Sequence, residues 1–227
     1  MQNGKGRISE IIYGFDDNLL LRVDCSSALT PAPGQYLLAD DGTADSVLAV
    51  PLFRVGSAPE VILQSPTLPP KHWLPGLELD LRGPLGHGFN LPAETSHIAL
   101  ASLGGGLARL LPLIHQNPQA DIAIFTDAAL PDLPVSVEVR RLADLPEAIP
   151  WADFLALELT IEILPKLRTI LGLAPHERPA CTAQTLIISP MPCGALAECG
   201  VCAVPARKSY KLACKDGPVL GLKQLQW

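Results

Sequence analysis

The chain has 227 residues, of which 48% are hydrophobic and 18% are charged. This composition excludes an intrinsically disordered chain, and the length allows two modest domains with their own cores. The formal net charge of −6 provides no general attraction to a phosphate backbone, so a nucleic-acid partner is not expected.

The beginning of the chain lacks the apolar core of a secretion signal, because residues 2–7 are all polar or glycine. The most apolar stretch, residues 98–114, is interrupted by three glycines and Arg109. It therefore does not predict a membrane-spanning helix, which needs about 20 apolar residues. A cytoplasmic protein without a membrane segment is expected.

Residues 1–93 are predicted to form an antiparallel β-barrel. Short apolar or alternating runs, typical of strands, are separated by turn residues such as Pro31-Ala32-Pro33-Gly34. The predicted strands cover residues 8–13, 19–23, 35–38, 47–55, 61–64 and 77–81. Their spacing is that of a small antiparallel barrel or sandwich.

Residues 94–189 are predicted to form a parallel α/β domain that resembles nucleotide-binding domains. Buried strands are expected at residues 97–102, 121–125, 135–139, 153–157 and 185–189. The last of these would end the sheet. Helices are expected over residues 107–115 and about 161–171, and strands that alternate with helices indicate a parallel sheet.

The strongest chemical signal lies in residues 190–227, which are predicted to form a small loop domain that holds a [2Fe–2S] cluster. The proposed ligands are Cys193, Cys199, Cys202 and Cys214. Their spacing is C-x5-C-x2-C-x11-C, whereas plant-type [2Fe–2S] sites use C-x4-C-x2-C and a distant fourth cysteine. Gly194 and Gly200 suit a loop whose backbone approaches the inorganic sulfides.

A structural zinc site is the main alternative for these cysteines. Zinc sites usually have two cysteines close together at each end of the motif, whereas Cys214 stands alone. Basic residues lie beside the last ligands, at Arg207, Lys208, Lys211 and Lys215. These cations either raise the reduction potential of a negatively charged cluster and attract an acidic partner, or belong to a solvated loop.

A glycine run follows the first predicted strand of the α/β domain. Gly104, Gly105 and Gly106 would let a pyrophosphate approach the N-terminus of the next helix, although such a run is as often an ordinary turn. The five histidines lie outside the cysteine cluster, which disfavours a Rieske centre. No hydrolase or kinase motif is present, and no catalytic residue is predicted.

The order of barrel, glycine-rich α/β domain and four-cysteine loop resembles the electron transfer subunit of the dihydroorotate dehydrogenase complex, within the ferredoxin reductase-like flavoproteins. The resemblance covers nearly the whole chain. It is carried by Pro33-Gly34-Gln35-Tyr36, by Gly83-Pro84-Leu85-Gly86-His87-Gly88-Phe89, by the glycine run with Pro112, and by Cys214-Lys215-Asp216-Gly217-Pro218-Val219.

The resemblance implies FAD on the barrel, NAD on the α/β domain, and a cluster between the flavin and a partner catalytic subunit that carries FMN. Electrons would pass from that dihydroorotate dehydrogenase-type partner through the cluster to FAD and NAD. The flavin would convert one-electron steps into hydride transfer. The chain would be an electron transfer subunit rather than a stand-alone enzyme.

The sequence departs from the family in the segments that hold the flavin and the nicotinamide. The family's arginine motif, R-x-x-S, is replaced at residues 47–53, where only Pro51 is retained. Thr67 falls where a family threonine helps to hold phosphate, but Pro66 replaces the preceding glycine. The family's Cys-Gly-Pro turn is absent at residues 157–160. A flavin-free iron–sulfur subunit with a docking or regulatory role is therefore the alternative function.

Overall fold

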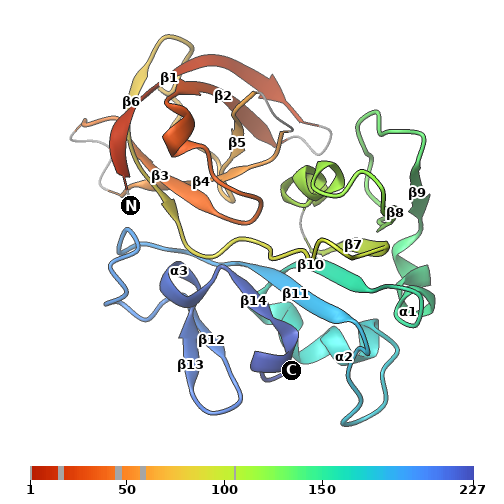
Figure 1. Cartoon of the computed structure of the whole chain (residues 1–227). Helices are drawn as coiled ribbons and strands as arrows, with labels where there is room; N and C mark the ends of the chain where they lie inside the picture. Colours follow the sequence, from red (N-terminus) through yellow and green to blue (C-terminus); the bar gives the residue numbers. More distant parts are fainter. Residues whose placement is uncertain (1, 15–17, 44–47, 57–59, 105) are drawn as a thin grey trace.

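The computed structural model describes residues 2–14, 18–43, 48–56, 60–104 and 106–227. This part of the chain forms a closed barrel, a six-stranded sheet and a two-stranded sheet. Figure 1 shows the barrel on one side of the larger sheet and the hairpin of the smaller sheet on the other. Every helix in the described ranges is too short or not apolar enough to span a bilayer.

The barrel strands are β1 (Gln2–Tyr13), β2 (Leu19–Cys25), β3 (Tyr36–Asp40), β4 (Val50–Arg54), β5 (Ile62–Gln64) and β6 (Glu78–Leu85). The remaining strands are β7 (His97–Leu103), β8 (Asp121–Phe125), β9 (Val137–Arg140), β10 (Phe154–Thr160), β11 (Thr182–Ile188), β12 (Ala203–Pro205), β13 (Tyr210–Leu212) and β14 (Val219–Gly221). The α-helices are α1 (Leu145–Ala148), α2 (Leu167–Ile170) and α3 (Ala213–Asp216). The 3₁₀ segments are η1 (Ser27–Leu29), η2 (Leu107–Arg109), η3 (Leu111–His115), η4 (Leu142–Asp144), η5 (Ile161–Lys166) and η6 (Leu222–Gln224).

The N-terminal barrel closes in the strand order β1-β2-β5-β4-β3-β6, and every neighbouring pair is antiparallel. Alternate residues point inward, such as Leu21 and Val23 of β2 and Leu79 and Leu81 of β6. These side chains form a core of their own inside the barrel. The barrel predicted from the alternating runs is confirmed.

The larger sheet has the strand order β14-β11-β10-β7-β8-β9. All neighbours are parallel except β14, which is antiparallel to β11. Strands β7 and β10 are buried along nearly their whole length, as expected when both faces of a parallel sheet are covered. The predicted α/β sheet is confirmed, but it does not end at residues 185–189, because β14 of the C-terminal region forms its edge.

The two predicted helices of the α/β domain are wrong in type. Residues 107–115 form the 3₁₀ segments η2 and η3, and residues 161–170 form η5 followed by a single turn of α2. Proline explains both differences, because Pro112 lies at the start of η3 and Pro165 lies inside η5. A proline has no N–H for the helical hydrogen bond and clashes with the preceding turn, so only short 3₁₀ pieces form.

Candidate iron–sulfur centre

The chain between β11 and β12 forms a tight loop that carries three of the four candidate cysteines. Four of its residues have a positive φ, namely Gly194 (59°), Ala195 (63°), Ala197 (64°) and Gly200 (71°). A left-handed conformation costs an alanine roughly 1–2 kcal/mol, so it persists only where the surrounding structure imposes it. Residues in this conformation turn successive backbone N–H groups toward one concave side, where anionic sulfur is stabilised.

The four cysteines lie close together, with their most direct side-chain contacts in two pairs, and Cys193 also acts electrostatically on Cys214. The side chain of Cys193 hydrogen-bonds to that of Cys199, and Cys202 hydrogen-bonds to Cys214. Cys202 and Cys214 are buried, Cys193 is half-buried and Cys199 is exposed. No disulfide joins them, and no three His, Cys, Asp or Glu side chains in the described residues converge where one metal ion could bind.

The pKa of the Cys193 thiol is lowered by its neighbours in the loop. Burial alone would raise its pKa, but the Cys199 side chain and the N–H groups of Glu198, Cys199 and Ala197 outweigh burial and lower the pKa to about 6. Burial and the neighbouring Cys202 raise the pKa of Cys214 to about 12. The surroundings of Cys193 therefore already stabilise negative charge on its sulfur, which a metal-bound thiolate requires.

Three of the four segments that carry the sequence resemblance meet beside this loop. The N–H of His87 donates to the carbonyl oxygen of Gly217 (2.6 Å), and the N–H of Phe89 donates to that of Pro33 (2.9 Å). A Cβ at Gly86 would lie 2.5 Å from the Cδ of Pro218, so the close approach requires glycine. The segments around residues 33, 86 and 217 therefore fasten the C-terminal domain to the junction of the barrel and the α/β domain.

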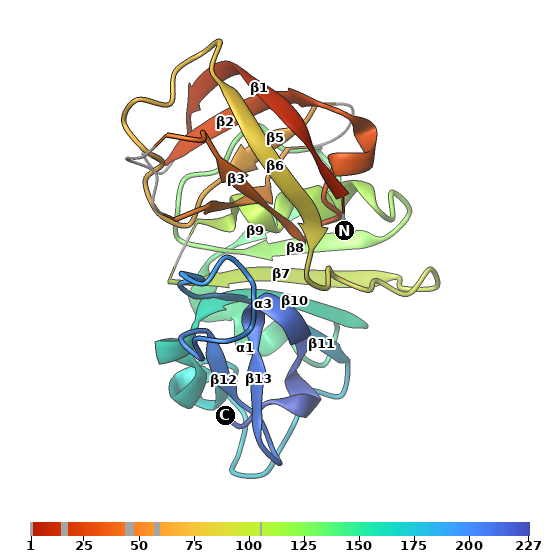
Figure 2. The ribbon, with the colours of Figure 1, turned by 90° about the vertical axis from the view of Figure 1, so that its left-hand side faces the viewer.

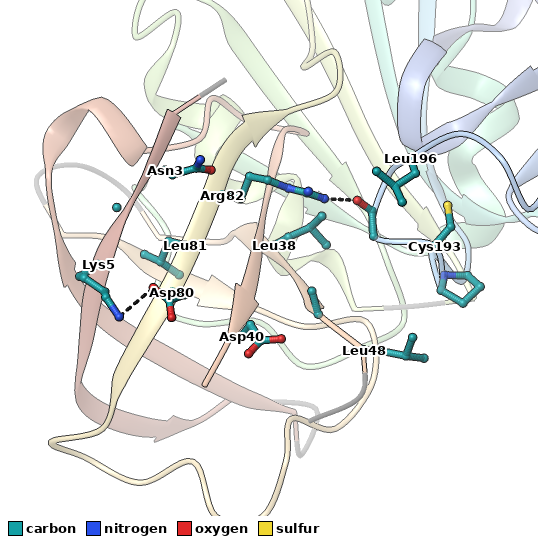
Figure 3. A pocket seen from close by; sticks show the side chains of 14 residues that line it. Asn3, Lys5, Leu38, Asp40, Leu48, Asp80, Leu81, Arg82, Cys193 and Leu196 are labelled. Atoms are coloured by element: carbon teal, nitrogen blue, oxygen red, sulfur yellow. Dashed lines mark hydrogen bonds and ion pairs between the residues drawn. The ribbon is translucent and has the colours of Figure 1, made fainter. Parts of the chain in front are cut away.

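The barrel contacts both the cysteine loop and the fourth cysteine, Cys214, directly. The buried hydroxyl of Tyr36 in β3 donates a 3.0 Å hydrogen bond to the carbonyl oxygen of Cys214. At the other end, the guanidinium of Arg82 in β6 donates to the carbonyl oxygen of Gly194, next to Cys193. Figure 3 shows Arg82 reaching from the barrel across a cavity of about 880 Å³ to this loop.

A second cavity of about 410 Å³ lies between the barrel and the carboxyl ends of β10 and β11. It shares Leu48, Ala49 and Pro192 with the cavity beside Cys193, so the two cavities adjoin. Thr67 lines it, with an exposed side chain whose hydroxyl lies 3.4 Å from that of Ser65. Ser189 also lines it and is buried, yet its hydroxyl has no hydrogen-bond partner among the described residues.

Arg109 follows the glycine run but is not available to a phosphate. Its guanidinium makes a two-pronged ion pair with Glu158 of β10, at 2.7 and 3.1 Å, and a 2.7 Å hydrogen bond to the Oε1 of Gln64 in β5. All three side chains are buried, so this cluster joins the barrel to the sheet. Gly104 has a φ of 99° and Gly106 precedes η2, whereas Gly105 lies outside the described residues.

Two of the basic residues predicted near the last ligands lie in a different part of the structure from Arg82. Arg207 and Lys208 are exposed at the tip of the β12–β13 hairpin, which Figures 1 and 2 both place on the side of the sheet away from the barrel. The contact of Arg82 with the loop was missed from the sequence, because nothing in its local sequence distinguishes it from other strand residues. Tyr36 belongs to a segment that carries the resemblance, but its contact with Cys214 was not predicted.

Comparison with known proteins identifies the C-terminal region. Residues 189–226 match the iron–sulfur cluster binding domain of dihydroorotate dehydrogenase B. This region is therefore similar to that domain. A search of curated proteins gives no match for the chain.

Solved structures account for the rest of the fold. The NADH-dependent reduced ferredoxin-NADP oxidoreductase, described in a study of flavin-based electron bifurcation, superposes with a TM-score of 0.71 at 16% identity, over 98% of this chain and 90% of that chain. A ferredoxin NADP+ reductase from Neisseria gonorrhoeae, with bound FAD and NADP, has a TM-score of 0.57 at 12% identity, over 82% of this chain and 99% of that chain. The cluster domain, combined with this reductase-like fold, confirms the predicted resemblance to the dihydroorotate dehydrogenase electron transfer subunit.

Proposed function

We propose that this chain is an electron transfer subunit in which Cys193, Cys199, Cys202 and Cys214 hold a [2Fe–2S] cluster. The cluster would exchange single electrons with the flavin of FAD and with a partner dehydrogenase that carries FMN. By resemblance, that partner is a dihydroorotate dehydrogenase-type catalytic subunit, and NAD is the other redox partner. The chain itself supplies ligands, orientation and charge rather than an acid, a base or a nucleophile.

The arrangement of the cysteines in two contacting pairs carries this proposal. A [2Fe–2S] centre has two irons, each of which takes two protein thiolates, whereas a structural zinc ion gathers four ligands around one point. The pairs Cys193–Cys199 and Cys202–Cys214 match the binuclear arrangement. The N–H groups of Ala197, Glu198 and Cys199 point at sulfur in the same loop, which favours an anionic centre.

The cavity between the barrel and β10–β11 is the place where we propose that the flavin ring binds. It adjoins the cavity beside Cys193, which would keep the flavin close to the cluster. Apolar walls with a few polar groups are typical of cofactor sites, and the unpartnered hydroxyl of Ser189 and the exposed Thr67 could each bond a ligand.

A flavin-free subunit is the second candidate, and the charges of this cavity favour it. No Lys or Arg lines the cavity at Thr67 among the described residues. Arg54, which follows the altered motif, donates to the carbonyl oxygens of Gly56 and Pro31, and Arg109 is paired with Glu158. A pyrophosphate beside Thr67 would therefore meet no Lys or Arg among the described residues that line this cavity. In this case the barrel would act as a docking or regulatory module.

Anaerobic purification separates these possibilities. The cluster predicts equal amounts of iron and acid-labile sulfide, two of each per chain, and an EPR signal after reduction with dithionite. Stoichiometric zinc without iron would instead indicate a structural zinc site, and the chain would then be a zinc-stabilised binding protein. Heat release followed by chromatography then tests for FAD, and its absence from iron-loaded protein would select the flavin-free candidate.

Single substitutions test the ligands. Cys202→Ser should lose the EPR signal and most of the iron, because Cys202 is buried in the loop. Cys25→Ser is the matched control, since Cys25 lies at the end of barrel strand β2 and outside the loop. An EPR signal of wild-type shape and intensity in Cys202→Ser would overturn the ligand assignment.

A further inference from the structure

We infer that Arg82 of the barrel sets the reduction potential of the centre held by the cysteine loop, and that it also fixes the position of Cys193. The inference rests on the proposed function, because it requires a redox centre at the four cysteines. Arg82 would be a positioning residue, since it binds the loop backbone rather than the centre itself.

The geometry of Arg82 supports both parts of this role. It is half-buried on strand β6, and its guanidinium donates to the carbonyl oxygen of Gly194, the residue that directly follows Cys193. A Cβ at Gly194 would lie 3.5 Å from the Nη2 of Arg82, so the guanidinium rests against the loop backbone itself. Figure 3 shows the side chain extended across the cavity toward Cys193 and Leu196.

The charge of Arg82 is not cancelled locally. Among the described residues its only polar partner is the neutral carbonyl of Gly194. Lys5 lines the same cavity, but its ammonium is neutralised by Asp80 at 2.8 Å and Glu78 at 3.5 Å. The guanidinium is thus the one uncompensated cation that the described part of the barrel directs at the cysteine loop across this cavity.

Electrostatics predicts whether Arg82 raises or lowers the midpoint potential of the centre. Reduction by dithionite adds one electron to a centre that four thiolates already make negative, and no bond to the protein needs to form or break. A nearby fixed cation stabilises the more negative, reduced state more than the oxidised state. Arg82 should therefore raise the midpoint potential. The environment of Tyr36 is consistent with this proximity, because Cys214, Cys202, Cys193 and Arg82 all act on its hydroxyl.

The cations that the sequence placed near the ligands are a weaker source of this effect. Arg207, Lys208 and Lys215 are exposed, so water and salt screen their charges. Lys211 is half-buried, but it lines a different cavity, which the carboxylate of Asp216 also lines. Arg82 is half-buried between the barrel and the loop, where screening is smaller. Through Arg82, the barrel would therefore influence the centre electrostatically as well as hold the cysteine loop in position.

The test is an EPR-monitored redox titration of the full-length, iron-loaded protein with three substitutions of Arg82. Arg82→Lys keeps the charge, Arg82→Gln keeps an N–H donor without charge, and Arg82→Met removes both. We expect a midpoint near the wild-type value for Arg82→Lys and a shift to more negative potential for Arg82→Gln and Arg82→Met. Lys5→Met removes a cation of the same cavity whose side chain, like that of its partner Asp80, is 58% exposed. Because water and salt screen such exposed charges, it should shift the midpoint less than Arg82→Gln does.

The outcomes distinguish this inference from the proposed function. Wild-type protein without iron and sulfide would overturn the proposed function, and the role of Arg82 with it. Iron-loaded wild-type and Arg82→Gln proteins with the same midpoint would overturn the role of Arg82 alone. An equal shift in Arg82→Lys and Arg82→Gln would also contradict a charge effect, as would loss of iron from all three variants.

Discussion

The hydroxyl of Tyr36 donates a hydrogen bond to the carbonyl oxygen of Cys214 across 178 positions of the sequence. Tyr36 is fully buried, and its ring stacks at a tilt on Phe53 with 5.6 Å between the ring centroids. The bond connects barrel strand β3 to the last candidate ligand. Barrel and cluster domain therefore share one buried polar contact within a common apolar core.

Tyr36→Phe should weaken this connection. The substitution leaves the buried Cys214 carbonyl without its donor, so we expect a loss of roughly 1–3 kcal/mol in the free energy of unfolding. Urea unfolding under anaerobic conditions measures it. Tyr210→Phe is the matched control, because Tyr210 is 69% exposed, and its effect should stay within about 0.5 kcal/mol.

The same hydrogen bond predicts a pH dependence. Burial, followed by the charges of Cys214 and Cys202, raises the pKa of Tyr36 far above its usual value. A raised pKa in the folded state gives stability that is present below the unfolded pKa, about 10, and is lost as pH rises above it. The stability difference between wild type and Tyr36→Phe should therefore shrink above about pH 10. A constant difference across that range would contradict this account.

Gly86→Ala should detach the C-terminal domain. Gly86 has a φ of 71°, and a Cβ there would lie 2.5 Å from the Pro218 Cδ and 2.6 Å from the Gly217 oxygen. Backbone strain and overpacking together should lower the free energy of unfolding by roughly 2–5 kcal/mol and reduce the iron content of the protein. Gly76→Ala separates the two causes, since Gly76 also has a positive φ, 97°, but open space around it. Gly76→Ala should lower the free energy of unfolding by only about 1–2 kcal/mol, and this variant should keep its iron.

Breaking the buried pair of Arg109 and Glu158 should be strongly destabilising. Arg109→Met leaves the Glu158 carboxylate, which is 1% exposed, without its cation, and should cost roughly 3–5 kcal/mol. Combining it with Glu158→Leu removes both charges, so the double variant should be more stable than Arg109→Met alone. Arg140→Met, at an exposed pair with Glu138, should change stability by about 1 kcal/mol or less. Thermal unfolding of all the variants measures these differences.

The acidic thiol of Cys193 predicts selective labelling of cluster-free protein. With a pKa lowered to about 6, Cys193 is a thiolate at pH 7, and its reaction with iodoacetamide should fall as pH drops through 6. Mass spectrometry of the modified peptides measures the rate at each pH. Cys25 is an internal control, because burial and the neighbouring Asp24 raise its pKa. Equal labelling of Cys193 and Cys25 at pH 7 would contradict the prediction.

Local patterns in the sequence predicted most of the strands and the cysteine loop. Alternation in β2 and β6 reflects the two faces of a barrel wall, and a loop around a cluster needs closely spaced ligands. The helix predicted at residues 107–115 failed, because an apolar run does not reveal that Pro112 leaves room only for 3₁₀ turns. Strand β14, with three residues, is too short to show a pattern, and its pairing with β11 depends on the folded sheet.

The sequence by itself thus determined a barrel, a parallel sheet and a four-cysteine loop, because each depends on spacing within a short segment. Tertiary structure decided how the cysteines pair and which residues hold them. Arg82 and Gly194 are 112 positions apart, and Arg109 and Glu158 are 49 apart. Contacts over such separations arise only when the barrel, the sheet and the cysteine loop fold and pack together, so they cannot be predicted from the spacing of residues along the chain.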